Sequence, residues 1–202
     1  GYLRRFIDME FILPPCDRKE FCTHVFSQLG LTQCLNDRRG VGEESILSLF
    51  VDFLACFDLS LRDIEHCCRL FALAYYNTEQ NHYSFPILLS TIVLLRLLQP
   101  SLYAKFCGGQ CNSEEIIEFI NVQPKGPDFL DTSQGIAVEA DLMAVSPKQW
   151  RNEIAQQMKL RIENQDSPQS GLSSERIKSM PIERLQRLNS RFSHVAYNFQ
   201  YE

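Results

Sequence analysis

The chain has 202 residues, of which 45% are hydrophobic and 22% charged, a balance typical of a globular protein and not of a disordered one. The formal net charge is −5 at pH 7. This acidic balance argues against general nucleic-acid binding, which needs an excess of Lys and Arg to replace the counterions of the phosphates.

The first residues predict a helix end followed by a strand. Residues 2–8 read as the last turns of a helix, and residues 9–13 alternate with aromatic and β-branched side chains, which predicts a short strand. Pro14 and Pro15 end that strand because proline cannot donate to a sheet ladder. The chain has no initiator Met and opens directly in an amphipathic turn, which indicates a fragment whose upstream domain is missing; a tag remnant at Gly1 would give the same start.

Periodic apolar residues then predict four consecutive helices. Asp17 is the expected N-cap of the first and Ser60 of the third, and residues 36–42 are expected to form a loop. The fourth helix is the most apolar. It contains Arg96 and falls short of the roughly 20 apolar residues that span a bilayer, so we expect a buried core helix and not a membrane span. The four helices are expected at 17–29, 43–57, 61–76 and 85–98.

The second half of the chain predicts further helices. Pro100 begins a segment to Phe106, and Asn112 caps a helix that ends near Phe119. Residues 123–131 are rich in proline and are expected to be irregular. Two weaker helices are expected at 132–145 and 147–163, the second with Pro147 near its first turn.

Residues 164–174 are rich in Ser, Gln, Gly and Asp, which predicts a mobile linker. Residues 175–202 predict a C-terminal helix with a docked aromatic tail. The arginines of this region recur at intervals that could form a helical stripe for nucleic acid, but the neighbouring Glu175 and Glu183 favour a mixed surface. These arginines are Arg176, Arg184, Arg187 and Arg191.

Motifs of catalysis and metal binding are absent from the sequence. A phosphate-binding loop needs a Gly-Lys pair, and the chain has none; a strand ending in paired acids for Mg²⁺ is also missing. The four histidines show no metal or triad arrangement, and the pair Cys107 and Cys111 lacks a second pair at zinc spacing. Four of the other cysteines lie in apolar helical patterns, which indicates reduced, buried thiols of a cytoplasmic protein; they are Cys22, Cys56, Cys67 and Cys68.

Two segments carry a resemblance to a known family. Residues 2–17, Tyr-Leu-Arg-Arg-Phe-Ile-Asp-Met-Glu-Phe-Ile-Leu-Pro-Pro-Cys-Asp, resemble the junction between the core and lid of AAA+ and related ATPases, most closely the KAP family of P-loop ATPases. Residues 60–65, Ser-Leu-Arg-Asp-Ile-Glu, resemble the segment that opens the third lid helix of many AAA+ proteins. The resemblance covers residues 2–98. The chain departs from the pattern in having Ser60 where Gly is common and Cys16 within the Pro-Asp turn.

The resemblance implies roles for three arginines. Arg62 would be the second sensor, which contacts the nucleotide phosphates from the lid, because a guanidinium stays charged and can bind phosphate in a bidentate way. Arg4 and Arg5 lie where related ATPases place an arginine finger. The alternative for Arg62 is a solvated side chain paired with Asp63 or Glu65, and for Arg4 and Arg5 a pair of surface arginines.

The fold is therefore expected to be all-α, with a four-helix lid of the AAA+ type preceded by one short strand and followed by further helices. The expected units are the end of the ATPase core at 1–16, the lid at 17–98, a helical extension at 99–163, the linker at 164–174, and the C-terminal helix and tail at 175–202.

The implied function is that of a regulatory lid and C-terminal region of a KAP-like ATPase, which couples nucleotide state to an effector. The parent protein would bind ATP and Mg²⁺ and hydrolyse ATP, whereas this fragment is expected to bind no cofactor and to catalyse nothing alone. Its expected partners are the upstream nucleotide-binding core and a protein effector or a second copy; a membrane and nucleic acid are not expected. The alternative is a stand-alone α-helical protein-interaction domain.

Overall fold

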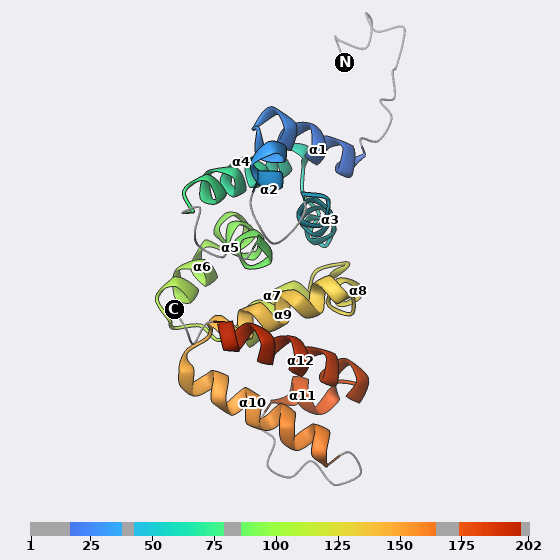
Figure 1. Ribbon diagram of the computed structural model, residues 1–202, viewed down its shortest axis with the longest axis vertical. Helices are drawn as coiled ribbons and strands as arrows, with labels where there is room; N and C mark the ends of the chain where they lie inside the picture. Colours follow the sequence, from blue (N-terminus) through green and yellow to red (C-terminus); the bar gives the residue numbers. More distant parts are fainter. Residues whose placement is uncertain (1–16, 38–42, 79–85, 165–173, 199–202) are drawn as a thin grey trace, which may run out of the picture.

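The computed structural model describes residues 17–37, 43–78, 86–164 and 174–198, and these form helices without a strand, so the expected all-α class is confirmed (Figure 1). The expected helix end at 2–8, the strand at 9–13 and the linker residues 165–173 lie outside the described residues. The twelve helices within them are α1 Arg18–Gln28, α2 Leu31–Asp37, α3 Glu43–Leu54, α4 Leu61–Tyr76, α5 Pro86–Leu98, α6 Pro100–Cys107, α7 Ser113–Asn121, α8 Gly126–Leu130, α9 Ser133–Val145, α10 Lys148–Glu163, α11 Glu175–Ser179 and α12 Ile182–Asn198.

Aromatic side chains hold α1, α3 and α4 together. The rings of Phe26, Phe50 and Phe71, one from each helix, lie with centroids 5.2 to 5.9 Å apart, and all three side chains are fully buried. Pairs in this range add to the free energy that burial of the rings already contributes. The apolar faces predicted for the helices at 43–57 and 61–76 are confirmed, because their members are buried: Ile46, Leu49, Phe50, Phe53, Leu54 and Phe57, then Ile64, Cys68, Phe71, Ala72 and Tyr75. The predicted helix end at residue 57 is wrong, since α3 ends at Leu54 and Phe57 is buried in the turn after it.

The connection from α1 to α3 differs from the prediction. The structure has the short helix α2 at Leu31–Asp37, so the expected loop at 36–42 is wrong for its first two residues; residues 38–42 lie outside the described part. Gly30, with φ of 68°, allows the turn between α1 and α2. The hydroxyl of Tyr76, at the end of α4, donates to the carbonyl oxygen of Leu29 at 2.8 Å, so α4 also satisfies the end of α1.

The helix α5 lies between the first four helices and the rest of the chain, and it packs against both α4 and α9 (Figure 1). Two aromatic pairs make the same connection, one from α3 and one from the turn that follows it. Phe53 stacks on Phe129 of α8 with ring centroids 5.2 Å apart, and Phe57 lies 5.6 Å from Phe119 of α7. Buried side chains of both halves therefore belong to one continuous hydrophobic core.

The segment 123–131 was expected to be irregular, and that prediction is wrong for residues 126–130, which form α8. Proline is accommodated because Pro127 lies in the first turn, where its missing N–H is not needed. Two buried glycines allow α8 to lie against its neighbours. A Cβ at Gly126 would lie 1.7 Å from the carbonyl oxygen of Ile120, and one at Gly135 would lie 2.1 Å from that of Phe129.

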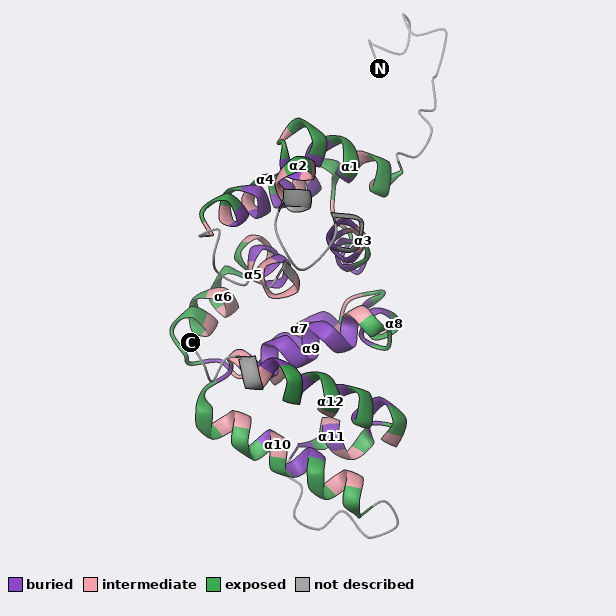
Figure 2. Ribbon diagram, viewed as in Figure 1, coloured by how far each residue is buried: buried purple, intermediate pink, exposed green. Residues whose placement is uncertain are grey.

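The most buried helix is α9, in which every residue from Gly135 to Ala144 is buried (Figure 2). Thr132 caps its start by accepting a hydrogen bond from the backbone N–H of Gly135 at 3.0 Å. Its most extensive partner is α12, and α5, α7, α8 and α10 also pack on it. An apolar helix that is covered on all sides is the interior element of a larger domain.

Within the described residues, no helix combines the length and apolar character that crossing a bilayer would need.

We expect Gly126→Ala to lower the free energy of unfolding by about 3 kcal/mol or more, because the new methyl group would overlap backbone that cannot move independently. Gly109→Ala is the control. Gly109 has φ of 64° but open space around it, so only the cost of the left-handed conformation, about 1 kcal/mol, is expected. Urea unfolding followed by circular dichroism measures both. Equal losses in the two variants would contradict the tight packing of α8.

Candidate functional site

The start of α4 presents Arg62 to solvent. Ser60 and Asp63 form a capping box, in which the Asp63 N–H donates to Ser60 Oγ at 3.2 Å and the Ser60 N–H donates to Asp63 Oδ2 at 3.3 Å. This confirms Ser60 as the predicted N-cap. Arg62 is the second residue of the helix, and its side chain is exposed.

The acidic neighbours of Arg62 are engaged elsewhere. Asp63 also accepts the hydroxyl of Ser60 at 2.6 Å, and Glu65 accepts two hydrogen bonds from Arg69, at 2.7 and 3.0 Å. Arg62 makes no ion pair with any residue that the structure describes, so the expected alternative pairing with Asp63 or Glu65 is not found. A cation in the first turn also opposes the helix dipole, typically by 0.3–1 kcal/mol.

The other two arginines of the predicted site, Arg4 and Arg5, lie outside the described residues, so their distance from Arg62 is not defined. In the described ranges, no group of three or more His, Cys, Asp or Glu side chains is arranged to hold a metal ion.

The cysteines of the described residues all carry free thiols. Cys22, Cys56, Cys67 and Cys68 are buried, as predicted. Burial raises the pKa of Cys56 and of Cys67 to about 12, with smaller contributions from the nearby Asp52 and Asp63 respectively. Thiols with such pKa values carry almost no thiolate at neutral pH, so these two are structural and not nucleophilic.

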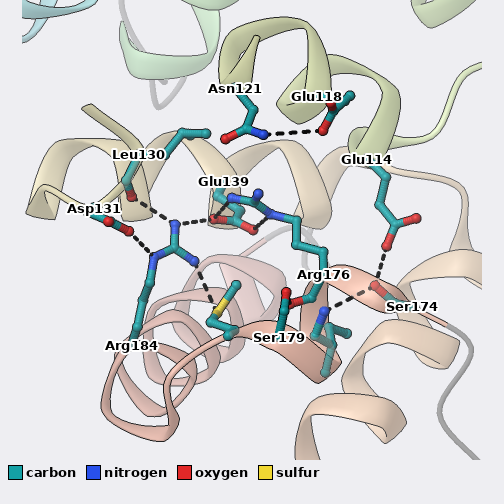
Figure 3. Close-up of polar contacts among 12 residues, drawn as sticks. Glu114, Glu118, Asn121, Leu130, Asp131, Glu139, Ser174, Arg176, Ser179 and Arg184 are labelled. Atoms are coloured by element: carbon teal, nitrogen blue, oxygen red, sulfur yellow. Dashed lines mark hydrogen bonds and ion pairs between the residues drawn. The ribbon is translucent and has the colours of Figure 1, made fainter. Parts of the chain in front are cut away.

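A buried ion cluster, which sequence reasoning missed, lies between α8, α9, α11 and α12 (Figure 3). Its centre is the carboxylate of Glu139, whose side chain is fully buried in the middle of α9. Arg176 of α11 donates to both carboxylate oxygens, Nε to Oε1 at 2.8 Å and Nη2 to Oε2 at 3.1 Å. Arg184 of α12 donates to Oε2 from Nη2 at 2.8 Å. Two guanidinium groups thus share one carboxylate.

The remaining donors of Arg184 are also used. Its Nη2 donates to the carbonyl oxygen of Leu130 at 2.8 Å, its Nε donates to Asp131 Oδ1 at 3.0 Å, and its Nη1 lies 3.0 Å from the sulfur of Met180 (Figure 3). Leu130 and Asp131 form the C-terminal end of α8, where a cation is favoured by the helix dipole. Arg184 therefore joins the end of α8 to the middle of α9.

The arginines of residues 175–202 divide into two classes. Arg176 and Arg184 point into the protein. Burial disfavours the charged form of Arg176, but its hydrogen bonds to Glu139 and the Glu139 charge outweigh that effect and raise its pKa. Arg187 and Arg191 lie on the exposed face of α12 with Glu183. A stripe of all four arginines is therefore not present on the surface, and the two exposed arginines share their face with Glu183, in agreement with the mixed surface that the sequence favoured.

A second acidic residue of α9, Asp141, is almost fully buried, and its Oδ1 has no hydrogen-bond partner. Burial raises the pKa of Asp141 from an ordinary value of 3.8 to about 6, and the charge of Arg191 offsets this only in part. The sequence carried a signal for both acids. Glu139 and Asp141 interrupt an otherwise apolar run from Ile136 to Val145, and a charge in such a run needs a partner in the fold.

A groove of about 820 Å³ lies between α6 and α7, with the start of α11 at one end. Ser174 fixes that end. Its Oγ donates to Glu114 Oε1 at 2.5 Å (Figure 3), its backbone N–H donates to Gln157 at 2.9 Å, and its Oγ accepts from the N–H of Ile177. Ser174 was expected to belong to the linker; it is instead buried and caps α11. The groove is lined by Gln99, Ser101, Leu102, Lys105, Asn112, Glu114, Glu115, Glu118, Phe119, Val122, Ser174, Glu175 and Arg176.

Comparisons of the chain with protein-family models, with curated proteins and with solved structures found no match.

We expect Arg184→Met to lower the free energy of unfolding by about 3 kcal/mol, because it leaves the buried Glu139 carboxylate with one cation in place of two. The matched control is Arg187→Met, three residues away on the exposed face, for which a change within about 0.5 kcal/mol is expected. Chemical denaturation measures both. A loss in Arg184→Met no larger than in Arg187→Met would show that the ion cluster does not stabilise the fold.

Asp141 predicts a dependence of stability on pH. Its pKa in the folded chain lies above the ordinary value, so the folded state binds more protons between about pH 4 and pH 6, and stability falls as pH rises through that window. The difference between the two pKa values corresponds to about 3 kcal/mol. The free energy of unfolding is lowered by this full amount above about pH 6. Asp141→Asn should therefore raise the free energy of unfolding at about pH 8 and change it little at about pH 4.

The control for Asp141→Asn is Asp58→Asn, whose side chain is fully exposed. Urea unfolding at the two pH values compares wild type with both variants. An equal effect of Asp141→Asn at both pH values would mean that its carboxyl group does not titrate in this window.

Proposed function

We propose that this chain is the lid and C-terminal helical region of a KAP-like P-loop ATPase, and that it couples the nucleotide state of an upstream core to an effector. ATP and Mg²⁺ bind the parent protein, which hydrolyses ATP; the chain itself supplies a sensor and not the phosphate-binding loop. The cytoplasm is the proposed compartment, and the buried free thiols of α1 and α4 support it because they suit a reducing environment.

The observation that carries this proposal is the exposure of Arg62 in the first turn of the capped helix α4, without an ion pair among the described residues. A guanidinium that opposes the helix dipole and lacks a carboxylate partner can bind phosphate oxygens without first breaking an internal bond. The capping box of Ser60 and Asp63 fixes the direction in which this first turn projects.

Arg4 and Arg5 are retained as proposed arginine-finger residues. A finger would neutralise charge that develops on the phosphoryl group during transfer. This part of the proposal rests on the sequence resemblance alone.

The packing of α3 and α5 supports the proposed coupling. The pair Phe53–Phe129 joins α3 to α8, the pair Phe57–Phe119 joins the turn after α3 to α7, and α5 packs on both α4 and α9. A movement of α4 on nucleotide binding would therefore reach the C-terminal helices through packed side chains, which transmit displacement better than loops do.

A stand-alone α-helical interaction domain is the second candidate. The groove between α6 and α7 favours it, because such a surface needs no nucleotide.

Hydrolysis of ATP by the full-length protein tests the proposal. We expect Arg62→Ala to lower kcat about tenfold or more, equivalent to about 1.4 kcal/mol of transition-state stabilisation. Arg69→Ala is the matched control, since Arg69 is exposed on the same helix but paired with Glu65. Its kcat should stay within about twofold of wild type.

Two other outcomes decide against parts of the proposal. A wild-type protein that hydrolyses no ATP would contradict the ATPase assignment and leave the interaction domain. Normal kcat in both variants would keep the ATPase assignment and remove Arg62 from its site.

A further inference from the structure

The groove between α6 and α7 exposes apolar surface that the fold does not cover. None of the residues of α6 is fully buried, and Leu102 on its groove side is half-buried. Across the groove, Val122 at the end of α7 is 66% exposed, with Phe119 one turn before it. The apolar part of the groove can therefore accept a side chain from outside, whose burial would release water from all three residues.

The rim of the groove is acidic. Glu114, Glu115, Glu118 and Glu175 line it, against Lys105 and Arg176. Both cations already have carboxylate partners within the chain. Arg176 binds the buried Glu139, and Lys105 Nζ lies 3.8 Å from Glu115 Oε2. The carboxylate of Glu118 accepts a long hydrogen bond, 3.5 Å, from the side-chain amide of Asn121 (Figure 3), and its charge also acts on the Arg176 guanidinium without an ion pair between them. Glu175 is paired with Lys178 and Glu115 with Lys105, so the carboxylates of the rim without an ion pair among the described residues are Glu114 and Glu118.

The end of the groove at α11 is held in place by several hydrogen bonds. Ser174 is hydrogen-bonded to α7 and α10, and Arg176 is held by Glu139 through two bonds. Rigid walls favour binding because less conformational entropy is lost when a ligand enters. The volume of about 820 Å³ falls in the range of pockets that hold small ligands, so the groove has room for a large side chain.

We propose that this groove binds a peptide segment of a partner protein, in which Lys or Arg side chains flank one large apolar residue. The apolar residue lies against Leu102, Phe119 and Val122, and the cations face the carboxylates of Glu114 and Glu118. A nucleic acid does not suit this surface, because its phosphates would meet the acidic rim. This peptide site is compatible with both functions proposed above, the ATPase lid and the interaction domain. A contact of this size gives a weak and reversible complex.

Selection from a random dodecapeptide library displayed on phage, with the whole chain immobilised, tests the proposal. We expect the selected peptides to carry at least two Lys or Arg around one Leu, Met or Phe. Their Kd, measured by fluorescence anisotropy on synthetic copies, should rise about tenfold or more in Glu118→Lys and also in Val122→Ser. It should also rise with ionic strength, because opposite charges are screened.

Glu163→Lys is the control. It makes the same charge change as Glu118→Lys at an exposed site on α10, outside the groove, and should leave Kd within about twofold of wild type. Thermal melting of all three variants establishes that they fold. Three results would overturn the proposal: no selected peptide that binds, peptides without enrichment in Lys or Arg, or equal affinity for wild type and both groove variants. Sedimentation that shows dimers lost in Val122→Ser would assign the groove to a second copy of the chain instead.

Discussion

The carboxylate of Glu139 lies in the middle of the most buried helix, and the arrangement of the C-terminal half depends on how its charge is compensated. An isolated ion in such a place would cost several kcal/mol, so the fold must bring cations to it. Arg176 arrives on α11 and Arg184 on α12, and Arg184 also binds the end of α8. These bonds have direction, whereas apolar packing does not, so the cluster fixes how the three helices lie on α9.

The same cluster connects the core to the surface. Arg176 contacts Glu139 with its guanidinium and also lines the groove beside α7, and Ser174, two residues earlier, joins α11 to α7 and α10. The groove wall at this end is therefore held by the interior of the protein and not by a loop. The acidic character of the groove follows in part from this arrangement, since its one arginine is neutralised from within.

Most of the longer helices, and the caps at Asp17, Ser60 and Asn112, could be predicted from sequence because the signals for them are local. The repeat of Phe50, Phe53 and Leu54 defines the buried face of α3, and Ser60 or Asn112 with an acid three residues later defines a helix start. The exposure of Arg62 at the start of α4 follows from the same local reasoning. The role proposed for Arg62 depends on an upstream core, so neither the sequence of this chain nor its fold can establish it.

The parts that could not be predicted depend on contacts between residues far apart in the chain. The helix α8 forms in a proline-rich segment because Gly126 and Gly135 allow its neighbours to approach closely, and no local pattern encodes that approach. Arg176 and Arg184 bind inside the fold, whereas Arg187 and Arg191 are exposed. The sequence does not separate the two pairs, because all four arginines lie in one region predicted to be helical. What separates them is the position of Glu139 in α9, which depends on how the helices pack and not on the local sequence.

The sequence separation within the ion cluster has a consequence for biosynthesis. Arg176 and Arg184 follow Glu139 by 37 and 45 residues. The first bundle, formed by α1, α3 and α4 around Phe26, Phe50 and Phe71, is synthesised long before α12. Since domains fold as their residues leave the ribosome, the first bundle can close while α9 still exposes its apolar surface and an unpaired carboxylate. The part of the α9 surface that α12 covers stays exposed during that interval, and the arrival of α12 ends it.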